Sequence, residues 1–302
     1  MDFHKLLKDL DGVVEVEKYD FTSKFSFESS YELRKTADTH TQNVDTYRLV
    51  YQVNELKVVG YLCAPKNIEK MPLILHLRGG TRNFSMLSEK SIYQQMVRFS
   101  NEGYAVASTQ YPGVEGGDGK DGFGSRSDID SIVKLKDIIC QLPFIDSEKI
   151  AIKGHSRGGL MAYMLLKEYN WIRAAVIISA PTDQFRQAEF REGWKEHQIS
   201  MWGDDKEETL RRSPAFWVDK LNKETPILLM HGASDWRVDP TDSIEMSQKL
   251  YENKIPHRFI LYEGSDHSLS EQKDDYYKQI LSWLTRFIKL NESLPNSEPH
   301  GL

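Results

Sequence analysis

The stretch KGHSRGG at residues 153–159 constrains the fold more strongly than any other part of this sequence. An apolar run typical of a buried strand, residues 150–152, precedes it, and an apolar run typical of a helix, residues 160–166, follows it. The sequence thus predicts a strand that turns sharply into a helix through G-x-S-x-G, with Ser156 displayed on a strained turn between close-packed glycines. The alternative is a glycine-rich turn whose serine has no chemical role.

A serine hydroxyl needs a general base to become a nucleophile, and the base needs an acid to orient it. On a strand–turn–helix of this kind, the three residues follow one another along the chain as serine, acid and histidine. His267 lies downstream in the loop EGSDHS, after a predicted strand, at the edge where a parallel sheet places its sites. We therefore predict His267 as the base. Of the other downstream histidines, His197 lies in an insertion and His300 in a tail. His257 opens a strand at the opposite edge, and His231 ends a strand where packing explains it.

The acid is expected after the strand predicted at residues 226–230, where the segment HGASDWRVDP offers two aspartates. Asp239 precedes Pro240, and this pair is typical of a helix N-cap followed by proline at the first helical position. Asp235 has no such local role. We therefore predict that Asp235 is the acid that orients His267.

Two backbone regions are candidates for binding a developing oxyanion. Arg157 follows the serine at a helix N-terminus, where the first N–H groups have no acceptor within the helix. Gly79 and Gly80 follow the apolar strand PLILHL, and their small size lets N–H groups approach a substrate. A plain Gly-Gly turn is the alternative for this second region. Arg78, which precedes the two glycines, is a candidate for the substrate pocket.

Predicted strands alternate with predicted helices along most of the chain. This alternation indicates an α/β protein with a doubly wound, mostly parallel sheet and helices on both faces. The predicted strands, the first two of which form a hairpin, cover residues 47–53, 57–64, 72–77, 104–109, 150–152, 174–179, 226–230 and 258–262. The predicted helices cover residues 87–101, 127–142, 160–166, 240–253 and 271–290, and Ser127 and Asp130 are expected to form a capping box for the second.

Residues 181–222 interrupt the alternation with scattered aromatic and charged side chains. We predict a helical insertion over the carboxyl edge of the sheet and over the active site. Its aromatic residues are expected to shape an acyl pocket, with packing of the insertion onto the sheet as the alternative. The pocket candidates in the insertion are Phe185, Phe190 and Trp194.

The expected organisation has three parts. Residues 1–45 form an N-terminal extension that packs on the main domain, residues 46–290 form that domain, and residues 291–302 form a flexible tail. In the extension we expect a short helix followed by an edge strand. Three phenylalanines alternate with polar residues there: Phe21, Phe25 and Phe27.

The composition of the 302 residues, with 39% hydrophobic and 28% charged, is typical of a globular protein. The net charge of −6, without a basic stripe, argues against nucleic acid as a partner. No apolar run reaches the ~18 residues of a membrane helix, and residues 1–10 lack the apolar core of a signal peptide. Two cysteines, Cys63 and Cys140, fit a reducing compartment. We therefore expect a cytoplasmic protein with no membrane partner, and the oligomeric state stays open.

No cofactor or metal is expected. The sequence has neither H-E-x-x-H nor paired cysteines. The glycine-rich loop at residues 111–125 matches G-x-G-x-x-G from Gly117 to Gly122, but Pro112 and further turn residues separate it from the preceding strand. A dinucleotide site needs an immediate strand-to-helix turn. A structured loop near the rim of the active site is therefore the favoured interpretation.

With these motifs in place, residues 47–289 resemble the catalytic domain of the prolyl oligopeptidase family of α/β-hydrolases. The segments that carry the resemblance are GYLCAP, LILHLRGG, FIDSEKIAIKGHSRGGLMA, PILLMHGASDWRV and EGSDHSL. The resemblance implies a triad of Ser156, Asp235 and His267, in agreement with the assignment from the residues. Two features differ: about 45 leading residues are too few for the β-propeller of larger members, and some peptidase members have a tyrosine where this chain has Arg78.

The sequence therefore predicts a serine hydrolase that forms an acyl-enzyme on Ser156. A small-molecule ester with a short acyl group is the expected substrate. A serine peptidase of the prolyl oligopeptidase type acting on short peptides is the alternative, and a non-catalytic binding module on the same fold is a more remote one. The natural substrate is not specified, because fold and triad do not set specificity.

Overall fold

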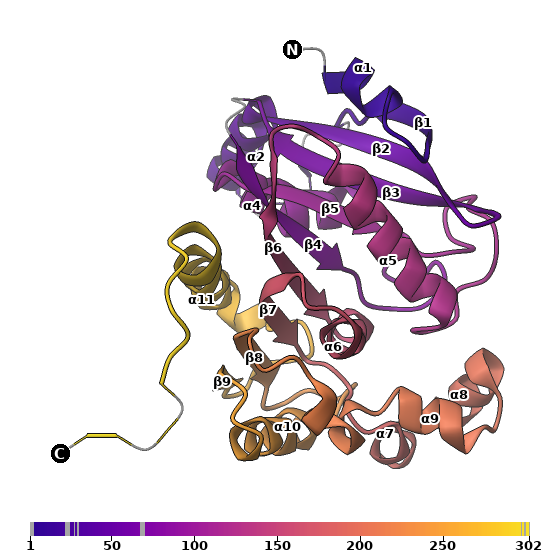
Figure 1. Cartoon of the computed structure of the whole chain (residues 1–302), viewed down its shortest axis with the longest axis vertical. Helices are drawn as coiled ribbons and strands as arrows, with labels where there is room; N and C mark the ends of the chain where they lie inside the picture. Colours follow the sequence, from indigo (N-terminus) through magenta and orange to yellow (C-terminus); the bar gives the residue numbers. More distant parts are fainter. Residues whose placement is uncertain are drawn as a thin grey trace. The chain divides into compact units, whose positions relative to one another are not determined.

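The computed structural model describes residues 3–21, 25–26, 28, 30–66, 70–296, 298 and 300–301. The chain divides into two compact units, Met1–Glu148 and Lys149–Leu302. Figure 1 shows strands and helices alternating along both of them.

The strands of the first unit run in the order β1-β2-β3-β5-β4. Their bounds are β1 (Val13–Lys18), β2 (Val44–Val53), β3 (Leu56–Pro65), β4 (Met71–Leu77) and β5 (Ala105–Thr109). β1, β2, β3 and β5 pair antiparallel, and β4 pairs parallel with β5. The predicted hairpin is confirmed: Val53 faces Leu56 across a turn in which Asn54 has a φ of 51°. Every residue of β4 is buried, as its continuous apolar run predicts.

The N-terminal region contains the predicted short helix, α1 (Phe3–Lys8), and the predicted edge strand, β1. The strand precedes the phenylalanine segment, of which Phe25 is buried and Phe27 lies outside the described residues. A second helix, α2 (Tyr31–Asn43), was not predicted. Ala37 is its one buried side chain in the described structure, so the sequence has almost no apolar periodicity there.

The helix predicted at residues 87–101 is present as α3 (Glu89–Ile92), a π-helical turn η1 (Tyr93–Val97) and α4 (Arg98–Asn101). This run packs against β3 and β5, and α5 (Arg126–Ile139) packs against β2 and β5.

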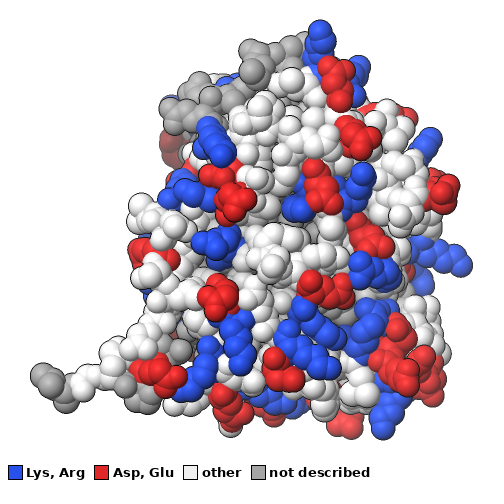
Figure 2. Space-filling view, viewed as in Figure 1, with Lys and Arg blue, Asp and Glu red and all other residues white. Residues whose placement is uncertain are grey.

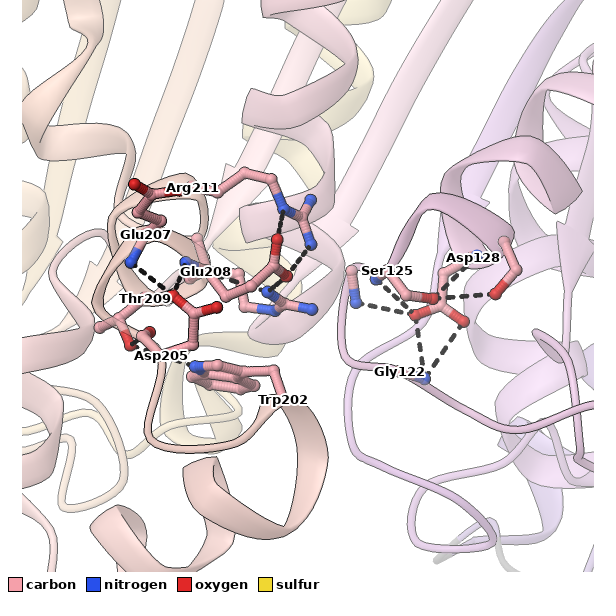
Figure 3. Close-up of polar contacts among 12 residues, drawn as sticks. Gly122, Ser125, Asp128, Trp202, Asp205, Glu207, Glu208, Thr209 and Arg211 are labelled. Atoms are coloured by element: carbon pink, nitrogen blue, oxygen red, sulfur yellow. Dashed lines mark hydrogen bonds and ion pairs between the residues drawn. The ribbon is translucent and has the colours of Figure 1, made fainter.

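The capping box predicted for α5 at Ser127 and Asp130 is wrong. Ser125 and Asp128 form it instead, because the fully buried Asp128 carboxylate accepts hydrogen bonds from the backbone N–H groups of Gly122, Gly124 and Ser125 (Figure 3). Asp130 forms an ion pair with Arg126 at 2.8 Å. The helix therefore starts where the glycine loop ends, earlier than predicted.

The glycine-rich loop before α5 is structured, as predicted. Four of its glycines have positive φ, among them Gly113 at 77°. The loop turns back onto the β2–β3 hairpin: the Asp118 N–H donates to the Lys57 carbonyl at 2.8 Å, and the Lys57 N–H donates to the Asp118 carboxylate at 2.9 Å. These bonds explain the glycines by turn geometry.

The strands of the second unit run in the order β6-β7-β8-β9, and all of them pair in parallel. Their bounds are β6 (Ile145–His155), which begins in the first unit, β7 (Ile172–Ile178), β8 (Ile227–Gly232) and β9 (His257–Tyr262). The helices α6 (Arg157–Glu168) and α10 (Thr241–Glu252) lie on one side of β7 and β8, and α11 (Lys273–Leu284) lies on the other (Figure 1). The predicted α/β class with a mostly parallel sheet is confirmed.

The chain between β7 and β8 is helical, as predicted. It contains α7 (Gln184–Phe190), α8 (Trp194–Trp202), α9 (Lys206–Arg211) and two 3₁₀ turns, Pro214–Phe216 and Val218–Lys220. Asp205 caps α9 through the N–H groups of Glu207 and Glu208, and the Glu208 carboxylate pairs with Arg211 (Figure 3). Capping of this kind stabilises short helices that bury few side chains.

The surface carries charges of both signs. On the face drawn in Figure 2, Lys and Arg side chains lie among Asp and Glu side chains without a field of one sign. Among the described residues, no helix combines the length and the apolar character that crossing a bilayer requires.

Candidate active site

Ser156 lies on the turn between β6 and α6, as the G-x-S-x-G pattern predicts. Its backbone has φ 56° and ψ −122°, a conformation that side chains rarely adopt. A Cβ on Gly154 would lie 2.2 Å from the Gly158 carbonyl oxygen, and a Cβ on Gly159 would lie 2.6 Å from the Cβ of Ala180. The glycines are therefore required by the close approach of strand, turn and helix.

The candidate oxyanion donors are placed by two different turns. Arg157 is the first residue of α6, so its N–H points out of a helix N-terminus. Gly79 and Gly80 belong to the first unit, where Gly80 has φ 71° and a Cβ on it would lie 2.2 Å from the Phe84 carbonyl oxygen. Glycine is thus needed at position 80 for the turn itself. Binding of an oxyanion by these residues stays a prediction.

Asp235 and His267 form a buried hydrogen-bonded pair. Asp235 follows β8, His267 follows β9, and the Asp235 Oδ2 lies 2.7 Å from the His267 Nδ1. Since a carboxylate only accepts, Nδ1 carries the proton and Nε2 keeps its lone pair. The two loops also meet through the backbone, because a Cβ on Gly232 would lie 2.3 Å from the Asp266 carbonyl oxygen. The residues that sequence position selected are thus brought together.

Asp235 accepts hydrogen bonds on both carboxylate oxygens. Oδ1 accepts the N–H groups of Arg237 at 2.8 Å and Val238 at 3.1 Å, and Oδ2 also accepts from the His231 Nε2 at 3.0 Å. Burial raises the pKa of this carboxyl, but the hydrogen bonds from His231 and His267 outweigh burial and hold its pKa well below the usual range. Asp235 is therefore ionised at neutral pH.

His231 was predicted only as a packing residue at the end of a strand, and the structure gives it a contact with the acid. Its Nε2 faces the Asp235 Oδ2 and, at 3.3 Å, the Val238 carbonyl, so this nitrogen carries the proton. Its Nδ1 then accepts from the Ser243 hydroxyl at 2.6 Å. A chain of hydrogen bonds therefore leads from α10 through His231 to Asp235.

His155, which sequence reasoning did not select, links the turn to the His267 loop. Its ring centre lies 4.8 Å from that of His267, and its Nε2 lies 2.8 Å from the His267 carbonyl oxygen, to which it donates. Burial and the neighbouring His267 lower the pKa of His155 to about 3. A neutral imidazole at physiological pH therefore holds the His267 loop beside Ser156. Its position in G-x-S-x-G was the one available signal.

Arg78, predicted for the substrate pocket, is buried and makes contacts of its own unit. Its guanidinium donates to the carbonyls of Gln110 at 2.5 Å, Gly79 at 3.0 Å and Arg82 at 3.3 Å, and lies 4.8 Å from the Tyr111 ring centre. These bonds tie the turn after β4 to the end of β5. They favour a structural role, and a part in the substrate pocket stays a prediction.

The pocket candidates of the insertion differ in exposure. Phe185 and Phe190 are 37% and 40% exposed, and Phe185 contacts Phe216 edge-to-face. Trp194 is 8% exposed and donates its indole N–H to Gln184 at 3.1 Å. Trp194 therefore packs inside the insertion, while the two phenylalanines present apolar surface.

The geometry of the second unit suits acyl transfer. A strained serine stands at a helix N-terminus, and the residue before it, His155, bonds to the carbonyl of a histidine whose proton is fixed on Nδ1 by a buried carboxylate. This leaves the histidine Nε2 able to accept a proton from the serine hydroxyl.

Comparisons with known proteins agree with this chemistry. A family model described as the prolyl oligopeptidase family matches residues 90–291, more than half of the chain, and one described as acetyl xylan esterase (AXE1) matches residues 18–131. The uncharacterized peptidase YtmA of Bacillus subtilis (strain 168) is 27% identical, over 82% of this chain and 95% of the relative. A probable dipeptidyl-peptidase 5 of Aspergillus terreus is 24% identical over 84% of this chain.

The lengths of these relatives differ. The chain spans nearly all of the bacterial relative but 37% of the fungal one. Among solved structures, the acylaminoacyl peptidase of Pyrococcus horikoshii matches with a TM-score of 0.75 at 17% identity, over 89% of this chain and 45% of that one. At this identity the match shows a shared fold, that of the α/β-hydrolases.

Proposed function

This chain belongs to the prolyl oligopeptidase family of serine hydrolases, and from that premise we propose that it hydrolyses small esters with short acyl groups through an acyl-enzyme on Ser156. The observation that carries the proposal is the 2.7 Å hydrogen bond between Asp235 and His267, on loops held beside the serine turn.

In the first half of the reaction, the Ser156 Oγ attacks the acyl carbon while its proton passes to the His267 Nε2. The carbonyl oxygen becomes an oxyanion, which the Arg157 N–H stabilises, with Gly79 or Gly80 as second donor on sequence grounds alone. When the C–O bond to the alcohol breaks, His267 returns the proton to the leaving oxygen. Water then attacks the acyl-enzyme by the same route.

Asp235 supports both halves of this cycle without accepting a proton. Its carboxylate keeps the His267 proton on Nδ1 and stabilises the imidazolium that forms when Nε2 is protonated. The donors on both of its oxygens keep it ionised and fixed in place.

The preference for a short acyl group rests on the insertion. Phe185 and Phe190 expose apolar rings on the helix that leads toward the acid loop, where Gln187 bonds to the Arg237 carbonyl at 2.5 Å. Pockets lined by aromatic rings bind small apolar groups. We take this insertion as the lid of the acyl pocket.

A serine peptidase acting on short peptides is the second candidate. The names of the relatives favour it. YtmA, of which this chain covers nearly the whole length, is named a peptidase, and the fungal relative is named a dipeptidyl-peptidase. Amide cleavage differs from ester cleavage in needing His267 to deliver its proton to a poor leaving nitrogen.

The test combines covalent labelling with turnover. A fluorophosphonate probe should label the wild type but not Ser156→Ala, and p-nitrophenyl acetate and butyrate should be hydrolysed by the wild type with kcat reduced about 10⁴-fold or more in the variant. Labelling that persists in Ser156→Ala, or a variant that keeps a tenth of its activity, would contradict the assignment of the nucleophile.

A further inference from the structure

Arg191, the residue that follows α7, has its guanidinium near two tryptophan rings, one of which also lies 4.6 Å from the Arg237 guanidinium carbon. Its guanidinium carbon is 4.9 Å from the ring centre of Trp194 and 6.0 Å from that of Trp236. Trp194 is buried within the insertion, whereas Trp236 is 61% exposed and directly follows Asp235 in the chain. Stacking on indole holds a guanidinium by cation–π attraction. The charge is therefore fixed beside the loop that carries the predicted catalytic acid.

Two anchors hold α7 in this place. The Gln187 amide donates to the Arg237 carbonyl at 2.5 Å, which joins the helix to the acid loop. Arg186 pairs with Asp242 at 2.9 Å and with Glu245 at 2.6 Å, which joins the helix to α10. Because the two anchors lie four and five residues before Arg191, its position depends on neither a long loop nor a chain end.

Arg191 forms no ion pair in the part of the chain that the structure describes, although the Asp235 carboxylate is near enough to interact with its charge. No carboxylate lies within ion-pair distance of its guanidinium, and its side chain donates no hydrogen bond there. Asp235, the nearby acid, already accepts four hydrogen bonds from other groups. On the same helix Arg186 has two carboxylates.

The unpaired charge has an energetic cost that a ligand could offset. Burial and the nearby Arg237 lower the pKa of Arg191 against the opposing effect of Asp235, although a guanidinium stays protonated at neutral pH. A half-buried cation has lost part of its hydration without gaining an ion pair. Its planar fork can bind both oxygens of a carboxylate, a geometry that lysine lacks.

We propose that Arg191 binds a carboxylate at the far end of the substrate's acyl group, so that the enzyme prefers half-esters of short dicarboxylic acids. This inference rests on the proposed ester hydrolysis at Ser156 and names its substrate class. The exposed Trp236 ring forms one wall of the carboxylate subsite, and the apolar rings of the insertion contact the methylene groups between the two ends of the acyl chain.

The test compares two esters that differ in one group. Mono-p-nitrophenyl glutarate carries the distal carboxylate, and the p-nitrophenyl ester of its half-amide replaces that carboxylate with a neutral carboxamide. The wild type should favour the anionic ester in kcat/KM by about 10- to 100-fold, the range expected for a charge-assisted hydrogen-bonded pair. Arg191→Gln should abolish this preference by lowering kcat/KM for the anionic ester, and Arg191→Lys should retain part of it.

Lys195→Gln is the matched control, since it removes one positive charge from the same insertion at a residue that already pairs with Asp204. It should keep the preference. A second measurement does not depend on turnover: tryptophan fluorescence reports the binding of glutarate to the wild type and to Arg191→Gln. The variant should bind glutarate at least tenfold more weakly.

Hydrolysis of both esters at equal efficiency would overturn the carboxylate subsite while leaving the proposed function intact. An equal loss of preference in Lys195→Gln would also overturn it, because a diffuse field would then explain the effect. If no ester is turned over and the probe does not label Ser156, the proposed function fails. Glutarate binding that Arg191→Gln leaves unchanged would overturn the carboxylate subsite separately.

Discussion

At the scale of single residues, Asp235 and Asp239 lie four positions apart and have different partners. Asp235 bonds to His267, whereas the Asp239 Oδ1 accepts the Thr241 N–H at 2.9 Å and caps α10. Asp235→Asn should lower kcat about 10³- to 10⁴-fold, because a carboxamide can present its N–H₂ to His267 and favour the wrong tautomer. Asp239→Asn should change kcat less than about twofold, since asparagine caps helices nearly as well as aspartate.

Ester turnover and thermal unfolding, measured on both variants in one buffer, check this ranking. Asp235→Asn should unfold within a few degrees of the wild type, because an amide oxygen can still accept the N–H groups of Arg237 and Val238. If Asp239→Asn lost the greater share of activity, the acid would have been assigned to the wrong residue.

His155 gives a prediction for stability against pH. Its pKa is about 3 in the folded protein, below the ordinary value of about 6.5, so the unfolded chain binds a proton between these limits and the folded chain does not. The free energy of unfolding should therefore fall as pH falls from about 6 to 4, by about 1.4 kcal/mol per pH unit for this group. His155→Gln should remove that contribution while its amide still donates to the His267 carbonyl.

Urea unfolding of the wild type and His155→Gln at several pH values between 4 and 7 measures the difference. The two proteins differ at this one side chain, so the difference between their curves isolates His155. Parallel curves for the two proteins would show that His155 titrates in the folded state as it does in the unfolded chain.

Residues that follow predicted strands could be selected from the sequence, and residues that act through tertiary contacts could not. Asp235 and His267 were selected because each follows a strand in the expected chain order. His231 lies four residues before Asp235, but its bond to the acid depends on the path of the loop between them. Arg191 depends on how α7 lies against Trp236, and no spacing in the sequence encodes that contact.

At the scale of elements, the turn from β6 into α6 leaves no room for a side chain at Gly154. Gly154→Ala would place a methyl group 2.2 Å from the Gly158 carbonyl oxygen, a backbone atom that cannot move aside without distorting the turn. The free energy of unfolding should fall by about 3 kcal/mol, the upper range for overpacking. Activity should fall as well, because Ser156 would shift.

Gly193→Ala is the comparison that isolates strain from collision. Gly193 has φ 72° with open space around its Cα, so the change should cost only the roughly 1–2 kcal/mol of a left-handed alanine. Chemical denaturation of both variants gives the two values. Equal losses would show that collision at Gly154 is relieved by the surrounding chain.

Elements with a strong apolar period were predictable, and those shaped by polar contacts were not. The strands β4 and β8 are continuous apolar runs and were located to within two residues at either end. The start of α5 was missed, because three backbone N–H groups bind Asp128 and make Ser125 the cap. The helix α2 was missed because it buries little apolar surface.

At the scale of the whole molecule, the fold class and the enzyme class followed from the order of motifs along the chain. The alternation of strands and helices predicted the mostly parallel sheet, and the order of serine, acid and histidine predicted a hydrolase. The substrate did not follow, because the insertion that we propose as the lid of the acyl pocket has no repeat or motif of its own. Relatives named as peptidases and a model named for an esterase both match this one chain.

Esters and amides therefore have to be ranked as substrates by experiment. The leaving group of an activated ester departs without full protonation. An amide, in contrast, has to be held so that His267 can protonate its leaving nitrogen. If the insertion binds a short acyl group, acyl p-nitrophenyl esters should exceed aminoacyl p-nitroanilides in kcat/KM by at least about 100-fold. The measurement uses one preparation, with Ser156→Ala as the blank for both substrates. Because p-nitrophenyl esters are intrinsically more reactive than p-nitroanilides, each enzymatic rate is divided by the rate of the same substrate with hydroxide. A rate enhancement for the amide equal to or above that for the ester would favour the peptidase.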